Sequence, residues 1–512
     1  MTPEEKIERA WQLLNKEMKG QSLSDRLAHL SWLLLLKYID NYDVVLKSTS
    51  QHDGKFYTPI LESNYCWSTW VPKALSTSCV DGKEIVEFLR NDLFTYLALP
   101  RAISSKLKIH DTLCSIFGWK EIPICDAPNI LREMLFLIDD INFFDLEHQY
   151  AIASLYEGYI QDMEISVTSA RDFFTPREIK NTMLKMLKPQ QNQTFFDPAC
   201  GTGGMLIEAY EYIKSHHGQK ASQSMLLFGQ ALDSTGALIS AINMASIGKP
   251  VEHIYHGDML QGYPDHFPKG FDYVLANPPF GIIKDEQARK NPFFKTLYYE
   301  PLLLQSFIDA ISEEGGTSSV IVSITTLTRD IAAFVDVRER LLTECDLLMV
   351  IVLPPGVFAP HTDVRTSILF FRKPGPTRET FYYNACPSEE SLKYEHPLLD
   401  QYLSQAVEAC GKWQQYRISG KGRPESIENS WIETFNNETF RENKYRLGTH
   451  CSYVPMEEPL LPEAPIDILL EYNHRFYHTV DNLSLPVELT SQLLKYSQEF
   501  HQQLSAFHKD IE

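Results

Sequence analysis

Between residues 194 and 371, short apolar segments alternate with stretches of helical character, and this alternation constrains the fold more than any other feature of the chain. Helices are expected over residues 203–217 and 236–247, between the first apolar segments. Strands that alternate with helices form βαβ units, which build a parallel, doubly wound sheet, so the pattern predicts an α/β fold. The expected strands are 194–196, 226–228, 253–255, 273–276, 319–322, 348–353 and 368–371.

The 512 residues are too many for one compact core, so several domains are expected. Residues 1–145 are predicted to form a helical N-terminal domain, in which Thr2 can cap a helix that starts at Pro3. Residues 146–375 contain the alternating segments and form the α/β domain. Residues 376–512 are interpreted as a C-terminal extension, in which the alternation weakens and which ends in a helical tail from residue 466.

The composition is that of an ordinary globular protein, with 44% hydrophobic and 22% charged residues. The longest apolar run, 32–36, is too short to span a bilayer, and the first residues lack the pattern of a secretory signal. No membrane association and a cytoplasmic location are therefore expected. The nine cysteines include no CxxC pair, which argues against a disulfide framework or a zinc site, and no metal is expected. A protein that binds DNA without a partner usually has a basic surface, whereas this chain has a net charge of −20.

The first motif that carries chemistry is a glycine-rich turn between an expected strand and an expected helix. Its sequence is Asp197-Pro198-Ala199-Cys200-Gly201-Thr202-Gly203-Gly204. The glycines let the backbone turn tightly and approach a ligand closely, and the helix that opens there offers free N–H groups to a carboxylate. The turn differs from the G-x-G-x-x-G dinucleotide fingerprint and lacks the Lys-Ser/Thr of a phosphate-binding loop. It resembles the cofactor loop of amino methyltransferases, which holds the methionine portion of S-adenosyl-L-methionine.

The second motif, Asn277-Pro278-Pro279-Phe280, follows another expected strand. In a doubly wound sheet the first and fourth strands flank the point where a crevice forms, so both motifs should face one cleft. The two prolines stiffen the backbone and fix the Asn277 side chain and the Pro278 carbonyl. An exocyclic amine has two N–H donors, which suit two convergent acceptors, and Phe280 can stack on its ring.

Several supporting segments fall in a fixed order around these motifs. With them, the chain resembles the methylation subunit of type I restriction-modification systems, a DNA adenine-N6 methyltransferase with a class I, Rossmann-like fold. The resemblance covers most of the sequence and implies that residues 146–375 are the catalytic domain. The supporting segments are 155–157, 173–178, 257–258, 353–358, 366–370, 443–447 and 453–454.

The resemblance also implies roles for individual residues. Asn277, Pro278, Pro279 and Phe280 would hold the target adenine, which must be extruded from the duplex to reach the cleft. Asp258 would lie near the adenine ring of S-adenosyl-L-methionine. The other residues expected at the cofactor are Phe174, Thr175, Pro176, Asp197, Ala199, Gly201, Thr202, Gly203 and Gly204.

Two positions depart from the family pattern. The family usually carries an acidic residue at the end of the second strand, where it binds the ribose hydroxyls of the cofactor, but Ala231 stands there. Gln230 and Asp233 are the candidates to compensate. The second departure is the segment 323–326, Ser-Ile-Thr-Thr, where relatives tend to carry a Pro-Asn type of turn.

The chain has no long insert that resembles a target-recognition domain. The resemblance therefore implies a separate specificity subunit that binds two methylation subunits, with double-stranded DNA as the substrate and a restriction subunit as a further candidate partner. Such a partner would also provide the phosphate contacts that the negative net charge disfavours. The C-terminal helix, with apolar residues such as Leu485 and Leu493, is either a docking element or packs on its own domain.

Other functions stay open. Enzymes with an Asn-Pro-Pro-Tyr motif methylate protein glutamine side chains, but Phe280 and the long helical N-terminus disfavour that activity here. Methylation of cytosine N4 is a second alternative. A third is a catalytically weakened subunit that binds S-adenosyl-L-methionine and serves assembly, which only Ala231 favours.

Overall fold

The computed structural model assigns residues Met1–Val454 to one compact unit and Pro455–Glu512 to another. The C-terminal helix predicted from residue 466 lies outside the described residues. In the part of the chain that the structure describes, no helix has the length and apolar character to span a membrane. The structure describes residues 1–76, 83–100, 107–118, 122–166, 175–283, 296–359, 362, 364–385, 397–424, 427–435 and 442–448.

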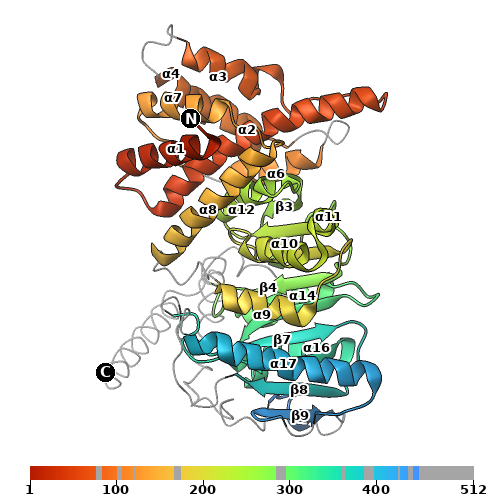
Figure 1. The fold of residues 1–512 in the computed structure, drawn as a ribbon. Helices are drawn as coiled ribbons and strands as arrows, with labels where there is room; N and C mark the ends of the chain where they lie inside the picture. Colours follow the sequence, from red (N-terminus) through yellow and green to blue (C-terminus); the bar gives the residue numbers. More distant parts are fainter. Residues whose placement is uncertain are drawn as a thin grey trace, which may run out of the picture. The chain divides into compact units, whose positions relative to one another are not determined.

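The first third of the chain is helical, as predicted, and Figure 1 shows its helices in red to orange. The predicted cap at Thr2 is confirmed: its side chain accepts from the N–H of Glu5 while the Glu5 carboxylate accepts from the N–H of Thr2. A second capping box, formed by Ser22 and Asp25, starts the long helix α2. The helices are α1 (Pro3–Glu17), α2 (Leu23–His52), α3 (Trp67–Leu75), α4 (Lys83–Glu87), α5 (Phe94–Ala98), α6 (Lys108–Phe117), α7 (Pro128–Asp139) and α8 (Leu146–Ser166).

The centre of the fold is a nine-stranded sheet with the order β3-β2-β1-β4-β5-β7-β6-β8-β9. All seven strands expected from the sequence are present. The prediction of a parallel sheet is wrong for β7, which runs antiparallel to both β5 and β6, and β9 is antiparallel to β8. The strands are β1 (Thr194–Asp197), β2 (Leu226–Ala231), β3 (Ile254–His256), β4 (Tyr273–Ala276), β5 (Thr317–Ser323), β6 (Asp346–Val352), β7 (Thr366–Arg372), β8 (Glu379–Asn384) and β9 (Ser430–Thr434).

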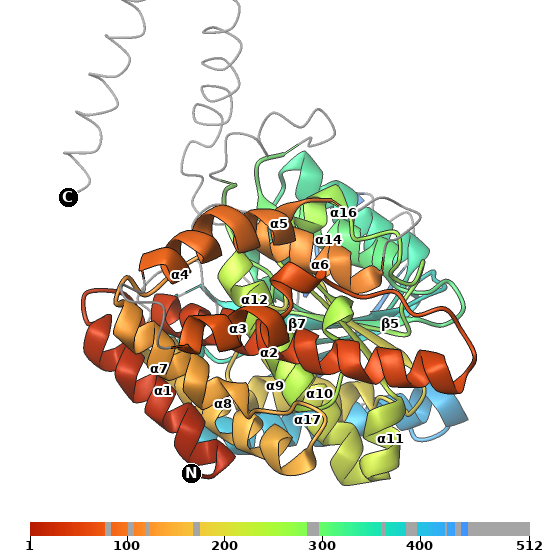
Figure 2. The ribbon, with the colours of Figure 1, turned by 90° about the horizontal axis from the view of Figure 1, so that it is seen from above.

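Helices cover both faces of the sheet. Figure 2 shows α9, α10 and α17 on one side of the strands, with α14 and α16 on the other. Successive strand residues supply the two cores: Phe195 belongs to the first core and Phe196 to the second. These helices are α9 (Arg177–Leu187), α10 (Gly204–His217), α14 (Tyr299–Ala310), α16 (Ala332–Glu344) and α17 (Pro397–Ser419), with α11 (Gln219–Ser224) and α12 (Ser234–Ser246) between β1 and β3.

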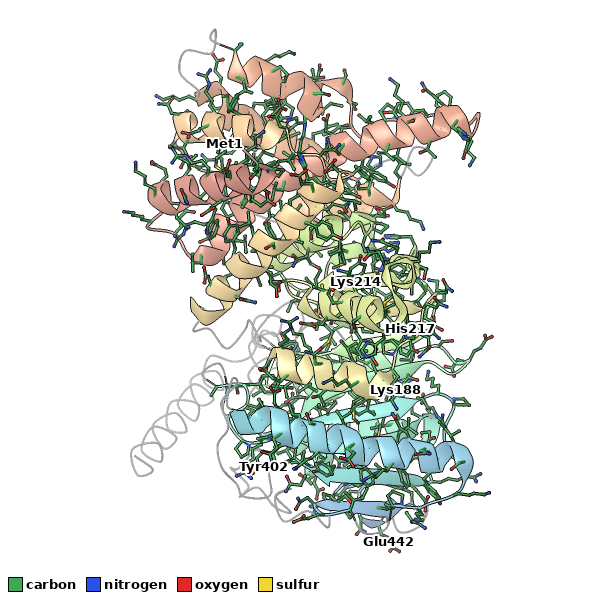
Figure 3. All side chains as sticks on the ribbon, in the orientation of Figure 1. Met1, Lys188, Lys214, His217, Tyr402 and Glu442 are labelled. Atoms are coloured by element: carbon green, nitrogen blue, oxygen red, sulfur yellow. The ribbon has the colours of Figure 1, made fainter. Side chains whose placement is uncertain are left out.

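The sheet continues past residue 375, where the sequence showed only a weakening of the alternation. The strands β8 and β9 lie in the C-terminal extension and add to β6, and neither was expected from the sequence. The helix α17 packs on α9. There, the Nζ of Lys188 (labelled in Figure 3) donates to Oε1 of Gln414 at 3.0 Å, and Nε2 of Gln414 donates to the Met186 carbonyl at 2.7 Å.

The helical first third also covers one edge of the sheet. On the edge strand β3, the carbonyl of Ile254 accepts from the Thr112 hydroxyl of α6 at 2.8 Å. The His256 N–H donates to the Ser115 hydroxyl at 3.2 Å. These contacts satisfy backbone groups that an edge strand otherwise exposes.

Candidate active site

The two motifs predicted to share a cleft follow neighbouring strands. The glycine-rich turn follows β1 and the Asn277 motif follows β4, and these strands pair in parallel with Phe195 opposite Tyr273. Because parallel strands end at the same edge of a sheet, both turns emerge there together. The strand order reverses at this point, since β2 and β3 lie on one side of β1 and β4 lies on the other.

The glycine-rich turn needs glycine at defined positions. Gly201 and Gly203 have φ values of 49° and 87°, in the left-handed region that other residues rarely adopt. A Cβ on Gly203 would lie 2.7 Å from Oγ of Ser240, so that position also lacks space. Gly203 caps the N-terminus of α10, whose first N–H groups therefore open beside the turn.

The turn rests on α12. A Cβ on Gly236 would lie 3.1 Å from the Gly201 carbonyl oxygen, and Nδ2 of Asn243 donates to the Thr202 carbonyl at 2.7 Å. With Ser240, these residues occupy positions i, i+4 and i+7 of the helix and thus one face. Sequence reasoning missed this support, although small and polar residues at helical spacing were a visible signal.

Asp197 ends β1 in a buried position, where its Oδ1 accepts from the Ala199 N–H at 3.0 Å. Burial raises the pKa of Asp197 to about 7, while that hydrogen bond and the charge of Lys180 act to lower it. Lys180 was not found from the sequence. It is buried on α9, and its Nζ lies 3.2 Å from the place of a Cβ on Gly204. A carboxylate and an ammonium group therefore lie near the start of α10.

Asn277 is buried, and among the described residues the NH₂ group of its side-chain amide has a hydrogen-bond partner while the oxygen has none. Its Nδ2 donates to Oγ1 of Thr175 at 3.0 Å, whereas its buried Oδ1 has no hydrogen-bond partner in the described part of the chain. The structure thus places the Thr175 hydroxyl on Asn277, whereas the resemblance implies that Thr175 borders the cofactor. Pro176 is buried and caps α9, and Phe174 lies outside the described residues.

The rest of the Asn-Pro-Pro-Phe motif follows the end of β4. Pro278 is buried, while Pro279 and Phe280 are partly exposed. Phe280 packs against the core on the α9 side of the sheet. The motif thus keeps Asn277 and Pro278 buried, while Pro279 and Phe280 are partly exposed, and the role of the motif in holding a base stays a prediction.

The ends of β2 and β3 hold the remaining predicted residues. Ala231 is fully buried at the last position of β2. Gln230 is also fully buried, and its Nε2 donates to the Gly262 carbonyl at 3.0 Å. Asp233 is exposed and caps α12 by accepting from the Gly236 N–H at 2.6 Å. Asp258 is partly exposed and accepts from the Leu260 N–H at 2.9 Å.

These residues fit S-adenosyl-L-methionine chemically. A Cβ on Gly201 would meet no atom of the described residues within 4 Å, so the glycine turn faces open space there. Free N–H groups at the start of α10 suit a carboxylate. The carboxyl of Asp197, next to Ala199 on the same turn, suits an ammonium group, and both groups occur in the methionine portion of the cofactor.

Comparison with known proteins identifies the family. Residues 148–458 match the family model described as N-6 DNA Methylase. The methylase subunit of the type I restriction enzyme EcoEI from Escherichia coli is 28% identical over 385 residues, which cover 72% of this chain and 75% of that protein. The EcoKI methylase subunit from Escherichia coli K12 is 26% identical over 303 residues, which cover 54% of this chain and 56% of that protein.

A solved structure from work on complex assembly and conformational transition of the type I R-M system is also similar. It matches with a TM-score of 0.71 and 26% identity, over 96% of this chain and 97% of the other. The family match spans residues 148–458, which is more than half of this chain. The chain therefore belongs to the N-6 DNA Methylase family.

Proposed function

We propose that this chain is the DNA-methylating subunit of a type I restriction-modification complex and that it methylates N6 of adenine with S-adenosyl-L-methionine. The observation that carries the proposal is the buried Oδ1 of Asn277, which has no partner among the described residues. Such an orphaned acceptor is costly unless a ligand donates to it. It lies at a strand end next to the glycine-rich turn, where an amine donor and a methyl donor can meet.

The residues of the second motif act by positioning the base. Oδ1 of Asn277 and the Pro278 carbonyl accept from the two N–H groups of the exocyclic amine, and the ring of Phe280 stacks on the extruded adenine. The lone pair of that nitrogen is conjugated with the ring, and two acceptors favour a pyramidal nitrogen that is aimed at the methyl group. Orientation therefore supplies most of the catalysis. S-adenosyl-L-methionine provides the electrophilic methyl group, carried on a positively charged sulfur.

The first motif and its neighbours hold the cofactor in this proposal. Asp197 pairs with the ammonium group, and the N–H groups at the start of α10 bind the carboxylate. Asp258 lies by the adenine ring. Of the two candidates for the ribose hydroxyls, Asp233 is favoured, because it is exposed while Gln230 is fully buried and donates to Gly262.

The proposed assembly comprises a specificity subunit, a second copy of this chain, a restriction subunit and double-stranded DNA, and a cytoplasmic location goes with that substrate. The net charge of −20 supports a division of labour, since the phosphates must be contacted largely by a partner.

Replacing Asn277 with Ala tests the proposal. Methyl transfer to DNA is measured in the complex with the specificity subunit, and the loss is expected to be on the order of a hundredfold, because the base loses its orientation. Binding of S-adenosyl-L-methionine to the variant, measured by calorimetry, should stay unchanged. Undiminished methyl transfer would refute the assignment. Failure of the unmodified chain to bind the cofactor would instead favour a purely structural role in the complex.

A further inference from the structure

The backbone that leaves the Asn-Pro-Pro-Phe motif is held by one buried carboxylate. Oε2 of Glu300 accepts from the Gly281 N–H at 3.1 Å, and Oε1 accepts from the Ser323 hydroxyl at 3.3 Å. Glu300 lies in the first turn of α14 and is only 6% exposed. Its two oxygens therefore join the segment after β4 to the end of β5.

Gly281 is fixed on both sides of its peptide. It has a φ of 87°, and its carbonyl accepts from the Tyr299 N–H at 2.9 Å. The neighbouring Ile282 forms an isolated bridge with Tyr298, so the chain pairs with itself just beyond the motif. The glycine next to Phe280 is thus held by Glu300 on its N–H and by the following segment on its carbonyl.

Ser323 anchors the other end of the link. Its hydroxyl lies 2.8 Å from that of Thr325 and 3.1 Å from that of Thr326, so the hydroxyl that binds Glu300 is itself held in a cluster of three. This is the segment that departs from the Pro-Asn type of turn expected by resemblance. A serine here provides a hydroxyl donor for Glu300, which gives the departure a physical reason.

The link has a cost that argues for a role beyond folding. Burial raises the pKa of Glu300, although hydrogen bonds from Gly281 and Ser323 and the charge of Arg329 act to lower it. Burying a carboxylate costs more free energy than burying a neutral group of similar size, even where hydrogen bonds satisfy it. The carboxylate offers two acceptors at fixed separation, which sets the distance between two strand ends.

We propose that Glu300, together with Ser323, positions Phe280 and Gly281 relative to Asn277 and thereby sets the platform for the target base. Glu300 touches neither base nor cofactor, so it is a positioning residue. The inference rests on the proposed function, because a base platform requires a flipped base.

The geometric part is tested on the full-length chain without a partner or DNA. Hydrogen–deuterium exchange is followed at peptides covering Gly281 in Glu300→Ala, Glu300→Gln and Asp309→Asn. The alanine variant removes the acceptor, so exchange at Gly281 should be roughly tenfold faster or more. Glutamine retains an acceptor for Gly281 and should restore protection. Asp309 lies on the same helix and pairs with Arg340, so Asp309→Asn perturbs α14 without touching the motif. Unchanged exchange in Glu300→Ala would overturn the proposal.

The functional part uses the complex with the specificity subunit and DNA with 2-aminopurine at the target position. In Glu300→Ala, kcat and the fluorescence rise on base extrusion should both fall on the order of tenfold, with the dissociation constant of S-adenosyl-L-methionine unchanged. Glu300→Gln should recover most of both signals. Wild-type kcat in Glu300→Ala would overturn the positioning role. If the proposed function itself is wrong, the wild-type complex will methylate no DNA. The hydrogen–deuterium exchange result will still decide whether Glu300 holds Gly281.

Discussion

At the scale of single residues, the two ends of the Asn277 amide differ in their contacts. The Thr175 hydroxyl accepts from Nδ2, while the buried Oδ1 has no hydrogen-bond partner among the described residues. A side-chain amide that could rotate freely would present a donor as often as an acceptor, and a donor would repel the N–H groups of an amine. In this structure the Thr175 hydroxyl accepts from Nδ2, and this hydrogen bond holds the Asn277 side chain in place with Oδ1 left as the acceptor.

Thr175→Val tests this role. The variant removes the hydroxyl and should lower kcat for methyl transfer about tenfold, in line with the loss of one hydrogen bond. The dissociation constant of S-adenosyl-L-methionine should stay the same, whereas a residue that borders the cofactor would raise it. Thr182→Val is the matched control, because the Thr182 hydroxyl donates only to Glu178 of its own helix. A higher dissociation constant with unchanged kcat would contradict the assignment.

The ionisation of Asp197 gives a second prediction. Its pKa lies at about 7 because burial disfavours the charged form, and only the carboxylate can pair with an ammonium group. Affinity for S-adenosyl-L-methionine should therefore rise with pH through about 7 and reach a plateau above it. Lys180→Met removes a charge that lowers this pKa, so the midpoint should move to higher pH. Calorimetric titrations between pH 5.5 and 8.5 measure both curves, and a flat profile in the wild type would exclude the ion pair.

At the scale of elements, the sequence predicted seven of the nine strands of the described sheet and missed β8, although five of its six residues are buried, and β9. Only one residue of β9 is buried, as expected for an edge strand, so it leaves no apolar signal. The reversed direction of β7 depends on pairing with β5 and β6, which are separated from each other in the sequence, and local pattern does not encode it. The glycine turn and Asn277 were found because their chemistry is local.

Supporting residues were missed because they act across elements. Lys180 and Glu300 are ordinary charged residues in their own helices, and only the fold brings them to the site. The face of α12 under the glycine turn was detectable in principle. Its role is the basis of the next prediction.

Gly236→Ala tests the support that α12 gives to the turn. The added methyl would meet the Gly201 carbonyl at 3.1 Å and Oδ2 of Asp233 at 2.7 Å. The free energy of unfolding should fall by about 1–3 kcal/mol through overpacking, and cofactor affinity should fall because Gly201 is displaced. Gly411→Ala is the control: a methyl there meets open space inside α17 and should stabilise the chain by about 0.5–1 kcal/mol. Urea unfolding measures the free energy of unfolding of each variant, and calorimetric titration measures its affinity for the cofactor. Equal effects of the two substitutions would refute the packing argument.

At the scale of the whole molecule, the division between residues 145 and 146 drawn from the sequence does not coincide with a gap in packing. The helix α8 starts at Leu146 and packs on α1 and α2, and Ser31 of α2 bonds to Tyr156 of α8. The helix α12, which supports the cofactor turn, packs against α2. The helical third of the chain thus shares a core with the part that carries the site.

We therefore expect that residues 1–145 cannot be removed without loss of the cofactor site. A chain of residues 146–512 would expose the buried face of α12 and leave the carbonyl of Ile254 and the N–H of His256 on edge strand β3 without their partners in α6. Exposed apolar surface and an open sheet edge both promote association. Size-exclusion chromatography should show aggregates, and calorimetry should show no binding of S-adenosyl-L-methionine.

In the full chain, tryptophan fluorescence and far-UV circular dichroism should report one coincident unfolding transition, because the shared core couples the two parts. A monomeric fragment that binds the cofactor as tightly as the full chain would show instead that the helical third is an independent module, joined to the catalytic part only by the chain.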